Sequence, residues 1–544
     1  MTIAIRSKRP APSTMSRIHA KHAGRPLCGL LALAAMGAAA QVFDDPTSGY
    51  GTLPSRAQST NESTVGNGRG FYFTPSVGVQ ATLTDNANLS ATDKQSDLIA
   101  SITPAIQMGG QSGRVKGFLD YALTASASAN GTQIDHLQNS LNAQVNVEAV
   151  PNWLYVDASA QISQQYISPF GTQSSDPTLA NSNRTETTTW NVSPYLSGQI
   201  AGTVNYLARV DYSQTNSGTT EASNSSTLLG NVHFDATTRW SKLGWLVDLL
   251  HRQDNFSQGR NTTDDIVLGQ LSYAVTPEFR ASLRANTESN NIITLERKTY
   301  NGWGWGLDWN PSPRTHLYLT QDQRFFGKSH SYGLDYRTPQ SVWSISSTQG
   351  LSTGQQNSGR GYPGSAFDLL FAQFAAIEPD PILRAQLVNA FLKANGIDPN
   401  AVVTSNYLPN QIQEERRQNA SVALLGRRST VIFNVYQTYS RNLGVLSNPG
   451  NDFANGNLTR WRGFGVTWSH RLTPQSNITV NASATKTTGE SSTDETTLWA
   501  LYGTWSSQVS RRATAAVSVR HQKFSSPTSP YDESAVIGTL SMTF

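Results

Sequence analysis

Ionisable residues recur at alternate positions along the chain, and both signs of charge occur among them. Such a set can line a wet passage, where a ring of one sign selects ions and opposite signs pair with each other. The mixture favours pairing that stiffens a wall over selection of a charged substrate, and we keep both interpretations open. We call these alternate polar positions the polar parity, and the positions between them the apolar parity. The ionisable residues of the polar parity are Arg114, Lys116, Asp120, Glu148, Asp157, Arg209, Asp211, Asp248, Arg280, Arg284, Glu288, Asp308, Asp322, Arg324, Asp335, Arg337 and Arg520.

Signals for catalysis are weak by comparison. After residue 40 the histidines are scattered, with no spacing typical of a metal site. Gly302-Trp303-Gly304 falls within an alternating stretch, so a phosphate-binding loop is not indicated. A lipase would need a nucleophile with an orienting partner, and none can be placed. We therefore expect no catalytic residue, no metal and no cofactor, and we expect that the protein is not an enzyme.

Aromatic residues form the third set with possible chemistry. Most share the apolar parity, which favours girdles at the two membrane interfaces over a track for stacking sugars. The set comprises Trp153, Tyr206, Trp245, Phe279, Trp303, Trp309, Tyr332, Tyr336, Trp343, Trp468 and Trp505.

The elements that position these residues are predicted to be strands with one apolar and one polar face. Val77, Val79, Ala81 and Leu83 alternate with polar or small residues, and the same period of two recurs as far as Phe544. Alternating segments of about ten residues separated by turns are typical of a transmembrane β-barrel.

The connections between these strands alternate in length. Short turns are predicted at Pro151-Asn152, Pro277-Glu278, Pro311-Ser312-Pro313, Gly426-Arg427-Arg428, Pro474-Gln475 and Ser510-Arg511. Long polar connections are predicted at 85–96, 168–186, 213–225, 252–263 and 439–459. Outer-membrane barrels have short periplasmic turns and long external loops. The pattern predicts about 22 strands, with an uncertainty of two.

The last strand supports this class over a secreted soluble β-repeat protein. Val536, Gly538, Leu540, Met542 and Phe544 share one face. A terminal aromatic on the lipid side resembles the signal read by the barrel-assembly machinery of bacterial outer membranes, so we expect that machinery as a partner through Phe544. Outer-membrane lipid is the other expected partner.

Composition agrees with a wall between lipid and water. Only 37% of the 544 residues are hydrophobic and 14% are charged, whereas soluble domains carry about 25% charged residues. The net charge of +4 does not describe the barrel, because residues 1–40 hold six of the 41 basic residues and no acidic one. The other 35 stand against 37 acidic residues, so no nucleic-acid partner is expected.

The N-terminus predicts a secretory signal peptide over 1–40, with cleavage after Ala40, and a flexible periplasmic tether over 41–69. Its apolar run is too short for a spanning helix. The single cysteine, Cys28, falls within this signal, so no disulfide is expected. A tether of this length also disfavours an energised receptor with an N-terminal plug domain. The barrel is predicted over 70–544.

One long connection, 350–419, is predicted to contain a helical hairpin at 366–377 and 380–395, because apolar residues recur there every three or four positions. Such a hairpin can cap or enter the wide lumen of a 22-stranded barrel, or lie outside it. We leave these two placements open. The plug or gate candidates are Leu370, Phe374, Leu387 and Phe391.

Several segments together resemble the outer-membrane proteins associated with PEP-CTERM/exosortase systems, which occur in exopolysaccharide gene neighbourhoods of Gram-negative bacteria. They are Thr84-Asp85-Asn86-Ala87-Asn88-Leu89, Ile102-Thr103-Pro104-Ala105-Ile106, Gln164-Gln165-Tyr166-Ile167-Ser168-Pro169-Phe170-Gly171, Asn183-Arg184-Thr185-Glu186, Ser193-Pro194-Tyr195-Leu196, Trp309-Asn310-Pro311-Ser312-Pro313-Arg314-Thr315 and Arg324-Phe325-Phe326-Gly327. Ala105 departs from the glycine expected at its position. The resemblance covers almost all of the chain after the signal and brings no catalytic residues.

The resemblance implies a channel or an export or anchoring component of the bacterial outer membrane, linked to exopolysaccharide or to surface-sorted proteins. Polysaccharide and such proteins are then the candidate partners. A general diffusion porin and a non-conducting scaffold for surface assembly are the alternatives.

Overall fold

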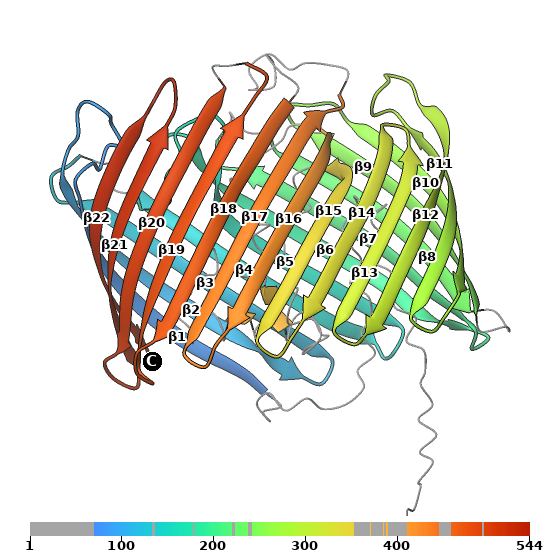
Figure 1. Ribbon diagram of the computed structural model, residues 1–544, viewed down its shortest axis with the longest axis horizontal. Coiled ribbons are helices and arrows are strands. Elements are labelled where there is room, and N and C mark those ends of the chain that lie inside the picture. The colour runs from blue at the N-terminus through green and yellow to red at the C-terminus, as the bar shows by residue number, and fades with distance from the viewer. Residues whose placement is uncertain are drawn as a thin grey trace, which may run out of the picture. The chain divides into compact units, whose positions relative to one another are not determined.

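The chain forms a closed antiparallel barrel of 22 strands in a computed structural model (Figure 1). The structure describes residues 70–132, 136–176, 178–179, 181–219, 223–237, 242–352, 370–371, 384–385, 388–389, 411–444, 458–491 and 494–544. The predicted signal peptide, its cleavage after Ala40 and the tether lie outside these residues.

Every strand pairs with its neighbours in sequence, so the sheet is a simple meander. The strands are β1 (Gly70–Thr84), β2 (Asp97–Ser112), β3 (Val115–Ser128), β4 (His136–Val150), β5 (Leu154–Tyr166), β6 (Arg184–Ile200), β7 (Val204–Ser217), β8 (Ser225–Thr237), β9 (Leu243–Phe256), β10 (Thr262–Ala274), β11 (Phe279–Asn290), β12 (Lys298–Ser312), β13 (Thr315–Arg324), β14 (Gly327–Arg337), β15 (Ser341–Ser352), β16 (Gln413–Leu425), β17 (Ser429–Asn442), β18 (Leu458–Arg471), β19 (Ser476–Thr488), β20 (Glu495–Gln508), β21 (Ala513–Ser525) and β22 (Tyr531–Thr543).

Closure is made by the first and last strands. β1 pairs with β22 from Ser76 opposite Thr543 to Thr84 opposite Ala535, and the amide of Phe544 donates to the carbonyl of Pro75 at 2.9 Å. No edge is left open, which is the condition for a sheet to stand in hydrocarbon. The predicted strand number is therefore confirmed.

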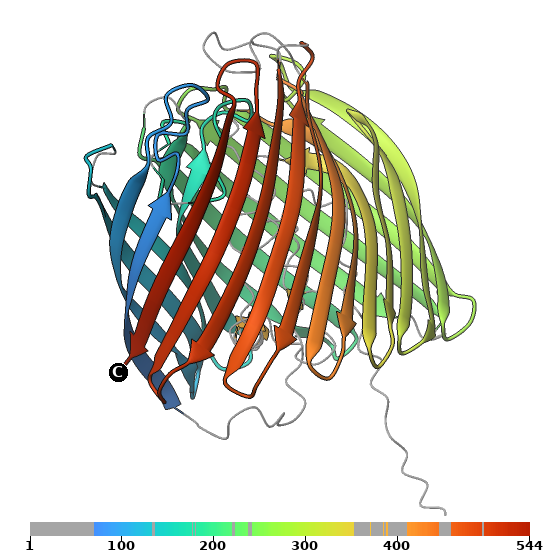
Figure 2. The same ribbon diagram turned by 60° about the vertical axis from the view of Figure 1, so that its left-hand side comes forward.

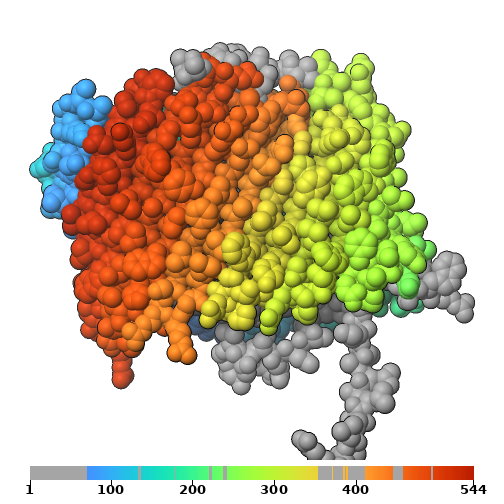
Figure 3. All heavy atoms as spheres, viewed as in Figure 1, coloured from blue at the N-terminus to red at the C-terminus, as the bar shows by residue number. Residues whose placement is uncertain are grey.

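The two faces of the wall follow the alternation in sequence. Val79, Leu83, Leu540 and Phe544 expose half or more of their surface on the outside, while the residues between them face the lumen. Figure 3 shows the outer wall as a continuous surface across the later strands. A barrel of this architecture with an apolar exterior is a bacterial outer-membrane protein.

Short turns lie at one end, which is the lower end in Figures 1 and 2, and the longer connections lie at the other. We take the long-loop end as external. The predicted long connections at 213–225 and 252–263 are wrong in extent, because β7 continues to Ser217 and β9 to Phe256. Residues 213–217 and 252–255 are polar at every position, so the period of two fades there and these strand ends resemble loops.

The connection between β15 and β16 runs from 353 to 412, slightly shorter than predicted. Eight of its residues are described, and six of these are helical: Leu370, Phe371, Arg384, Ala385, Val388 and Asn389. The other two, Gln411 and Ile412, lie just before β16 and are not helical. The predicted hairpin otherwise lies outside the described residues. None of the described helical residues belongs to a segment long and apolar enough to cross a membrane as a helix.

Candidate functional site

The inner wall carries ion pairs that link strands across one intervening strand. Arg209 of β7 lies 2.9 Å (Nη1–Oδ2) from Asp157 of β5 and 2.8 Å (Nε–Oδ1) from Asp211 of its own strand. Its guanidinium also stacks over the ring of Tyr195 on β6, 5.2 Å from the centroid. Arg209 is thus paired with two carboxylates of the wall, so the interpretation of these residues as paired structural groups is supported here.

A second ion pair depends on a glycine that lies between its two residues. Arg284 of β11 and Asp322 of β13 lie 3.3 Å apart (Nε–Oδ1), and both are almost fully buried. Gly304 of β12 lies opposite both residues in the register. A Cβ atom on Gly304 would come within 2.1 Å of Asp322 Oδ1, so the glycine is what allows the two charges to meet.

A third set lies one level nearer the external end. Arg324 of β13 donates to Glu288 of β11 at 3.1 Å (Nε–Oε2) and lies 3.7 Å (Nη2–Oδ2) from Asp264 of β10. Its guanidinium also lies 5.5 Å from the centroid of the Phe326 ring. Three strands are thereby joined through one buried cation.

The most buried charge of the wall holds an external connection inside the barrel. Arg520 of β21 binds Glu533 of β22 with two hydrogen bonds of 3.0 and 2.5 Å. It also donates to Asp176, which belongs to the β5–β6 connection. The side chain of Arg520 is fully buried. A connection that starts at β5 is therefore fixed to the wall at β21 and β22.

Neighbouring residues reinforce this attachment. The carbonyl of Gln173 accepts a hydrogen bond of 2.5 Å from the Tyr531 hydroxyl, and the Ser175 amide and hydroxyl donate to Gln522 Oε1 at 3.0 and 2.7 Å. Leu179 packs in an apolar cluster with Leu89, Ile99, Phe524 and Tyr531. We call the described residues of this connection, 167–176, 178–179 and 181–183, the inward loop.

Asp176 is organised for the charged state. Burial opposes its ionisation, but the Arg520 guanidinium and the amide and hydroxyl of Thr178 outweigh burial and hold the pKa of this carboxyl below its ordinary value. The Thr178 bonds measure 2.8 and 2.7 Å. The inward loop is thus pinned by an ionised carboxylate at neutral pH.

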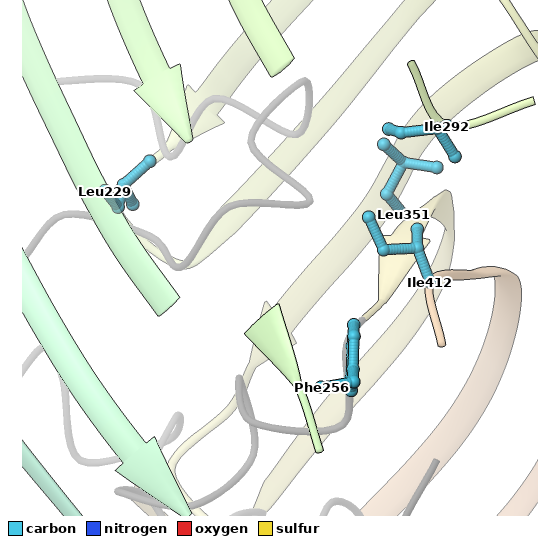
Figure 4. Packing of buried hydrophobic residues seen from close by; sticks show 5 residues of the cluster. All are labelled: Leu229, Phe256, Ile292, Leu351 and Ile412. Atoms are coloured by element: carbon cyan, nitrogen blue, oxygen red, sulfur yellow. The ribbon is translucent and has the colours of Figure 1, made fainter. Parts of the chain in front are cut away.

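A separate apolar cluster lies inside the external half, near β8, β9, β15 and β16 (Figure 4). Its buried members come from strand ends and connections: Leu229, Phe256, Ile292, Leu351 and Ile412. Phe325 and Phe326, at the tip of the β13–β14 hairpin, pack against it. Sequence analysis did not predict this cluster, because its members are scattered singly along the chain.

The predicted lumen residues divide into two groups. The first group lies in the strands on the inner parity. It includes Lys116, Asp120, Arg209, Asp211, Arg284, Asp322 and Arg324. Arg280 and Arg337 lie on the same parity at the end of the barrel that carries the short turns. Arg114 was wrongly assigned to the wall. It is exposed in the β2–β3 turn, after Gly113 at φ +54°, so no strand face applies to it.

Of the gate candidates the structure describes only Leu370, which is helical and 1% exposed. Figures 1 and 2 draw the described helical residues as a short gold ribbon between the near and far walls, toward the short-turn end. Arg384 lies over the ring of Phe371, 4.7 Å from the centroid. Phe374, Leu387 and Phe391 lie outside the described residues.

The predicted girdle aromatics are on the outside, with Trp303 67% and Trp505 45% exposed. The prediction missed a smaller inner set. The rings of Tyr155 and Tyr195 stack at 5.1 Å and 16°, and Tyr318 lies flat over Gly333, where a Cβ atom would be 2.2 Å from its ring. Among the described residues no group of three or more His, Cys, Asp or Glu could hold a metal ion.

No protein-family model matches the chain, and no curated protein matches it in sequence. Among solved structures, the siderophore receptor PirA from Pseudomonas aeruginosa aligns with 8% identity and a TM-score of 0.41, over 87% of this chain and 80% of that one. The FrpB iron transporter from Neisseria meningitidis aligns with 10% identity and a TM-score of 0.45, over 87% and 81%.

OccK2 (OpdF) from Pseudomonas aeruginosa, solved in complex with glucuronate, aligns with 10% identity and a TM-score of 0.33, over 87% of this chain and 98% of that one. Similarity at these levels says nothing about what the present barrel binds.

Proposed function

We propose that this protein is a non-enzymatic outer-membrane channel whose lumen is narrowed by its own connections, and that it takes part in the export of an extracellular polysaccharide. The observation that carries the channel is the inward loop, held on the inner wall by Asp176 and Arg520. A wall that only anchored surface proteins would have no need to fix an external connection inside its lumen.

The wall chemistry supports an uncharged or weakly charged polar cargo. Cations such as Arg209, Arg284 and Arg324 are each matched by carboxylates at short range, so they present little net field to a passing ion. The stacked rings of Tyr155 and Tyr195 offer an apolar face beside polar groups, which is the combination that sugar rings bind. The link to exopolysaccharide or to PEP-CTERM proteins rests on the family resemblance alone.

Conductance of purified protein in planar bilayers tests the channel. Ser352 and Gln413 are paired across β15 and β16, so an Asn-Gly turn can replace residues 353–412 and keep the register of both strands. The replacement removes Ile412 from the apolar cluster of Figure 4. We expect low conductance from the full chain and a large, steady conductance from this variant. Steady large conductance from the full chain indicates a diffusion porin, and none from either form indicates a scaffold.

Deletion of the gene tests the cargo. We expect surface polysaccharide to fall when the protein is absent and to return with the wild-type chain. Unchanged polysaccharide, together with loss of a surface-sorted protein, would contradict the export of polymer and favour anchoring.

We also propose that Phe544 is read by the barrel-assembly machinery. It directly follows β22 and is 59% exposed, so its ring is accessible to another protein before lipid surrounds it. Phe544→Ala should lower the yield of assembled barrel, measured by heat-modifiable migration, whereas Met542→Ala on the same face should not. Equal yields from the two variants would contradict the proposal.

A further inference from the structure

The outer face of β16 to β21 carries an excess of cations at its external end. Outward-facing basic residues are Arg416, Arg441, Arg460, Arg462, Lys486 and Lys523, against the carboxylates Glu414, Glu495 and Asp532. These strands form the orange and red face turned to the viewer in Figures 1 and 3.

The strand register arranges the central cations in two adjacent rows. Arg416, Tyr439 and Arg460 lie opposite one another in the upper row. Arg462 lies opposite Lys486 in the row below. Because side chains of one face repeat every two residues, Arg460 and Arg462 are about 7 Å apart along the strand.

Directly beneath these rows the surface becomes apolar. Phe464 and Trp499 pack edge to face with their centroids 5.6 Å apart, and Trp499 is 52% exposed. Val435 and Ala484 belong to this third row, which continues beyond Trp499 to Lys523. Leu501 lies in the next row down. The cations therefore lie at the level where the acyl chains of the outer leaflet give way to headgroups.

Most of these cations are available to a ligand. Arg441 is already bound to Glu414, at 3.0 Å from Nε. Lys486 meets Glu495 at 2.5 Å, but both side chains are half exposed, and such surface pairs hold weakly. Among the residues that the structure describes, Arg416, Arg460 and Arg462 form no ion pair with a carboxylate. Arg460 instead lies over the Tyr439 ring, 5.8 Å from the centroid.

The opposite charge occurs at the same end of another face. On β4 to β6 an outward carboxylate, Glu186, accepts hydrogen bonds from the amide and the side chain of Asn139 at 3.1 Å. This part of the external rim therefore carries the opposite charge.

We propose that this face binds a phosphorylated glycolipid of the outer leaflet, with Arg460, Arg462 and Lys486 on its phosphate and an acyl chain along Phe464 and Trp499. Guanidinium groups bind phosphate through paired hydrogen bonds, and basic residues next to a bilayer attract anionic headgroups. A free phosphate would need only the cations, whereas the aromatic pair beneath them fits a lipid.

The test measures binding of bis-phosphorylated lipid A to detergent-purified, full-length barrel in the presence of EDTA, by native mass spectrometry. The variant combines Arg460→Gln, Arg462→Gln and Lys486→Gln. We expect its affinity to fall on the order of a hundredfold, since each interfacial cation contributes about fivefold. The control, Lys298→Gln with Lys328→Gln, changes two cations outside this face and should bind as the wild type does.

Three results would overturn the proposal: unchanged affinity in the triple variant, an equal loss in the control, or equal binding of lipid A from which phosphatase has removed both phosphates. Displacement of lipid A by millimolar inorganic phosphate would also overturn it, because the site would then recognise phosphate without the lipid. Heat-modifiable migration confirms that each variant is a folded barrel. Arg462→Gln alone, expected to lose about fivefold, is the second variant should the triple fail to fold.

Discussion

Arg520 and Asp176 are 344 residues apart in sequence, and their side chains form a buried ion pair on the inner wall of the barrel. Arg520 also holds Glu533 on the adjacent strand, so it is shared between the wall and the inward loop. Loss of the Arg520 charge therefore affects the wall and the loop together, whereas loss of the Asp176 charge affects chiefly the loop.

Arg520→Ala should release the inward loop and raise the single-channel conductance of the variant that lacks residues 353–412. Removing one member of a buried pair leaves the other charge uncompensated, at a cost of roughly 3–5 kcal/mol. The loop can relieve that cost by moving Asp176 into water. Conductance in planar bilayers is the measurement.

The matched control is Arg511→Ala, which removes an exposed arginine from the short β20–β21 turn. It should leave conductance unchanged. Were both variants to conduct as the parent does, the inward loop would not narrow the passage.

The same pair predicts how the loop responds to pH. The pKa of Asp176 is lowered in the folded protein. The stabilisation that its ionised carboxylate gives to the folded state is therefore complete above the ordinary pKa of about 3.9, and it is lost as the pH falls toward the lowered pKa. Conductance should stay constant from pH 7 to pH 5 and rise only below about pH 4. Asp176→Asn should conduct more at every pH, with no step in the acid range.

These measurements use the variant that lacks residues 353–412 as the parent, and a rise in its conductance between pH 7 and pH 5 would contradict this assignment. The change would then have to come from a group with a higher pKa than Asp176, and the Asp176→Asn variant would show the same step.

The fold could be predicted because the local sequence of each strand shows which of its faces is apolar. The alternation of apolar and polar residues within a single strand assigns Leu540 to the outer face and Ser541 to the inner face, and no partner strand has to be known. The ends of strands were less predictable. At Ser217 and Phe256 the chain continues as strand beyond the lipid, where neither face must be apolar.

The site was less predictable because its contacts join distant parts of the chain. Parity assigned Arg284 and Asp322 to the lumen, but their contact depends on Gly304 between them. Asp176 lies in a polar connection without periodicity, so nothing local marks it as the partner of Arg520. The inner aromatics Tyr155 and Tyr195 were missed because the predicted aromatic set was interpreted as interfacial girdles and most of its members lie on the apolar parity.

Gly304→Val should destabilise the barrel by about 2 kcal/mol, because the new side chain would overlap Asp322 and push it away from Arg284. The midpoint of urea unfolding in detergent measures the effect. Gly269→Val is the control, since a Cβ atom at Gly269 meets nothing within 4 Å. Equal midpoints for the two variants would show that the Arg284–Asp322 pair does not depend on the glycine.

Cysteine labelling can distinguish the lipid-facing and water-facing sides of one strand, because the only cysteine of the chain is Cys28 in the predicted signal peptide. On β21, Val519 is outward and 56% exposed, and Ser518 lies on the inner parity beside it. Ser518→Cys should react with a hydrophilic maleimide in proteoliposomes, and Val519→Cys should not, because hydrocarbon covers it. A lipid-soluble maleimide should reverse the preference. If both positions reacted equally with the hydrophilic reagent, the wall would not separate lipid from water at this strand, and the assignment of inner and outer faces would be wrong.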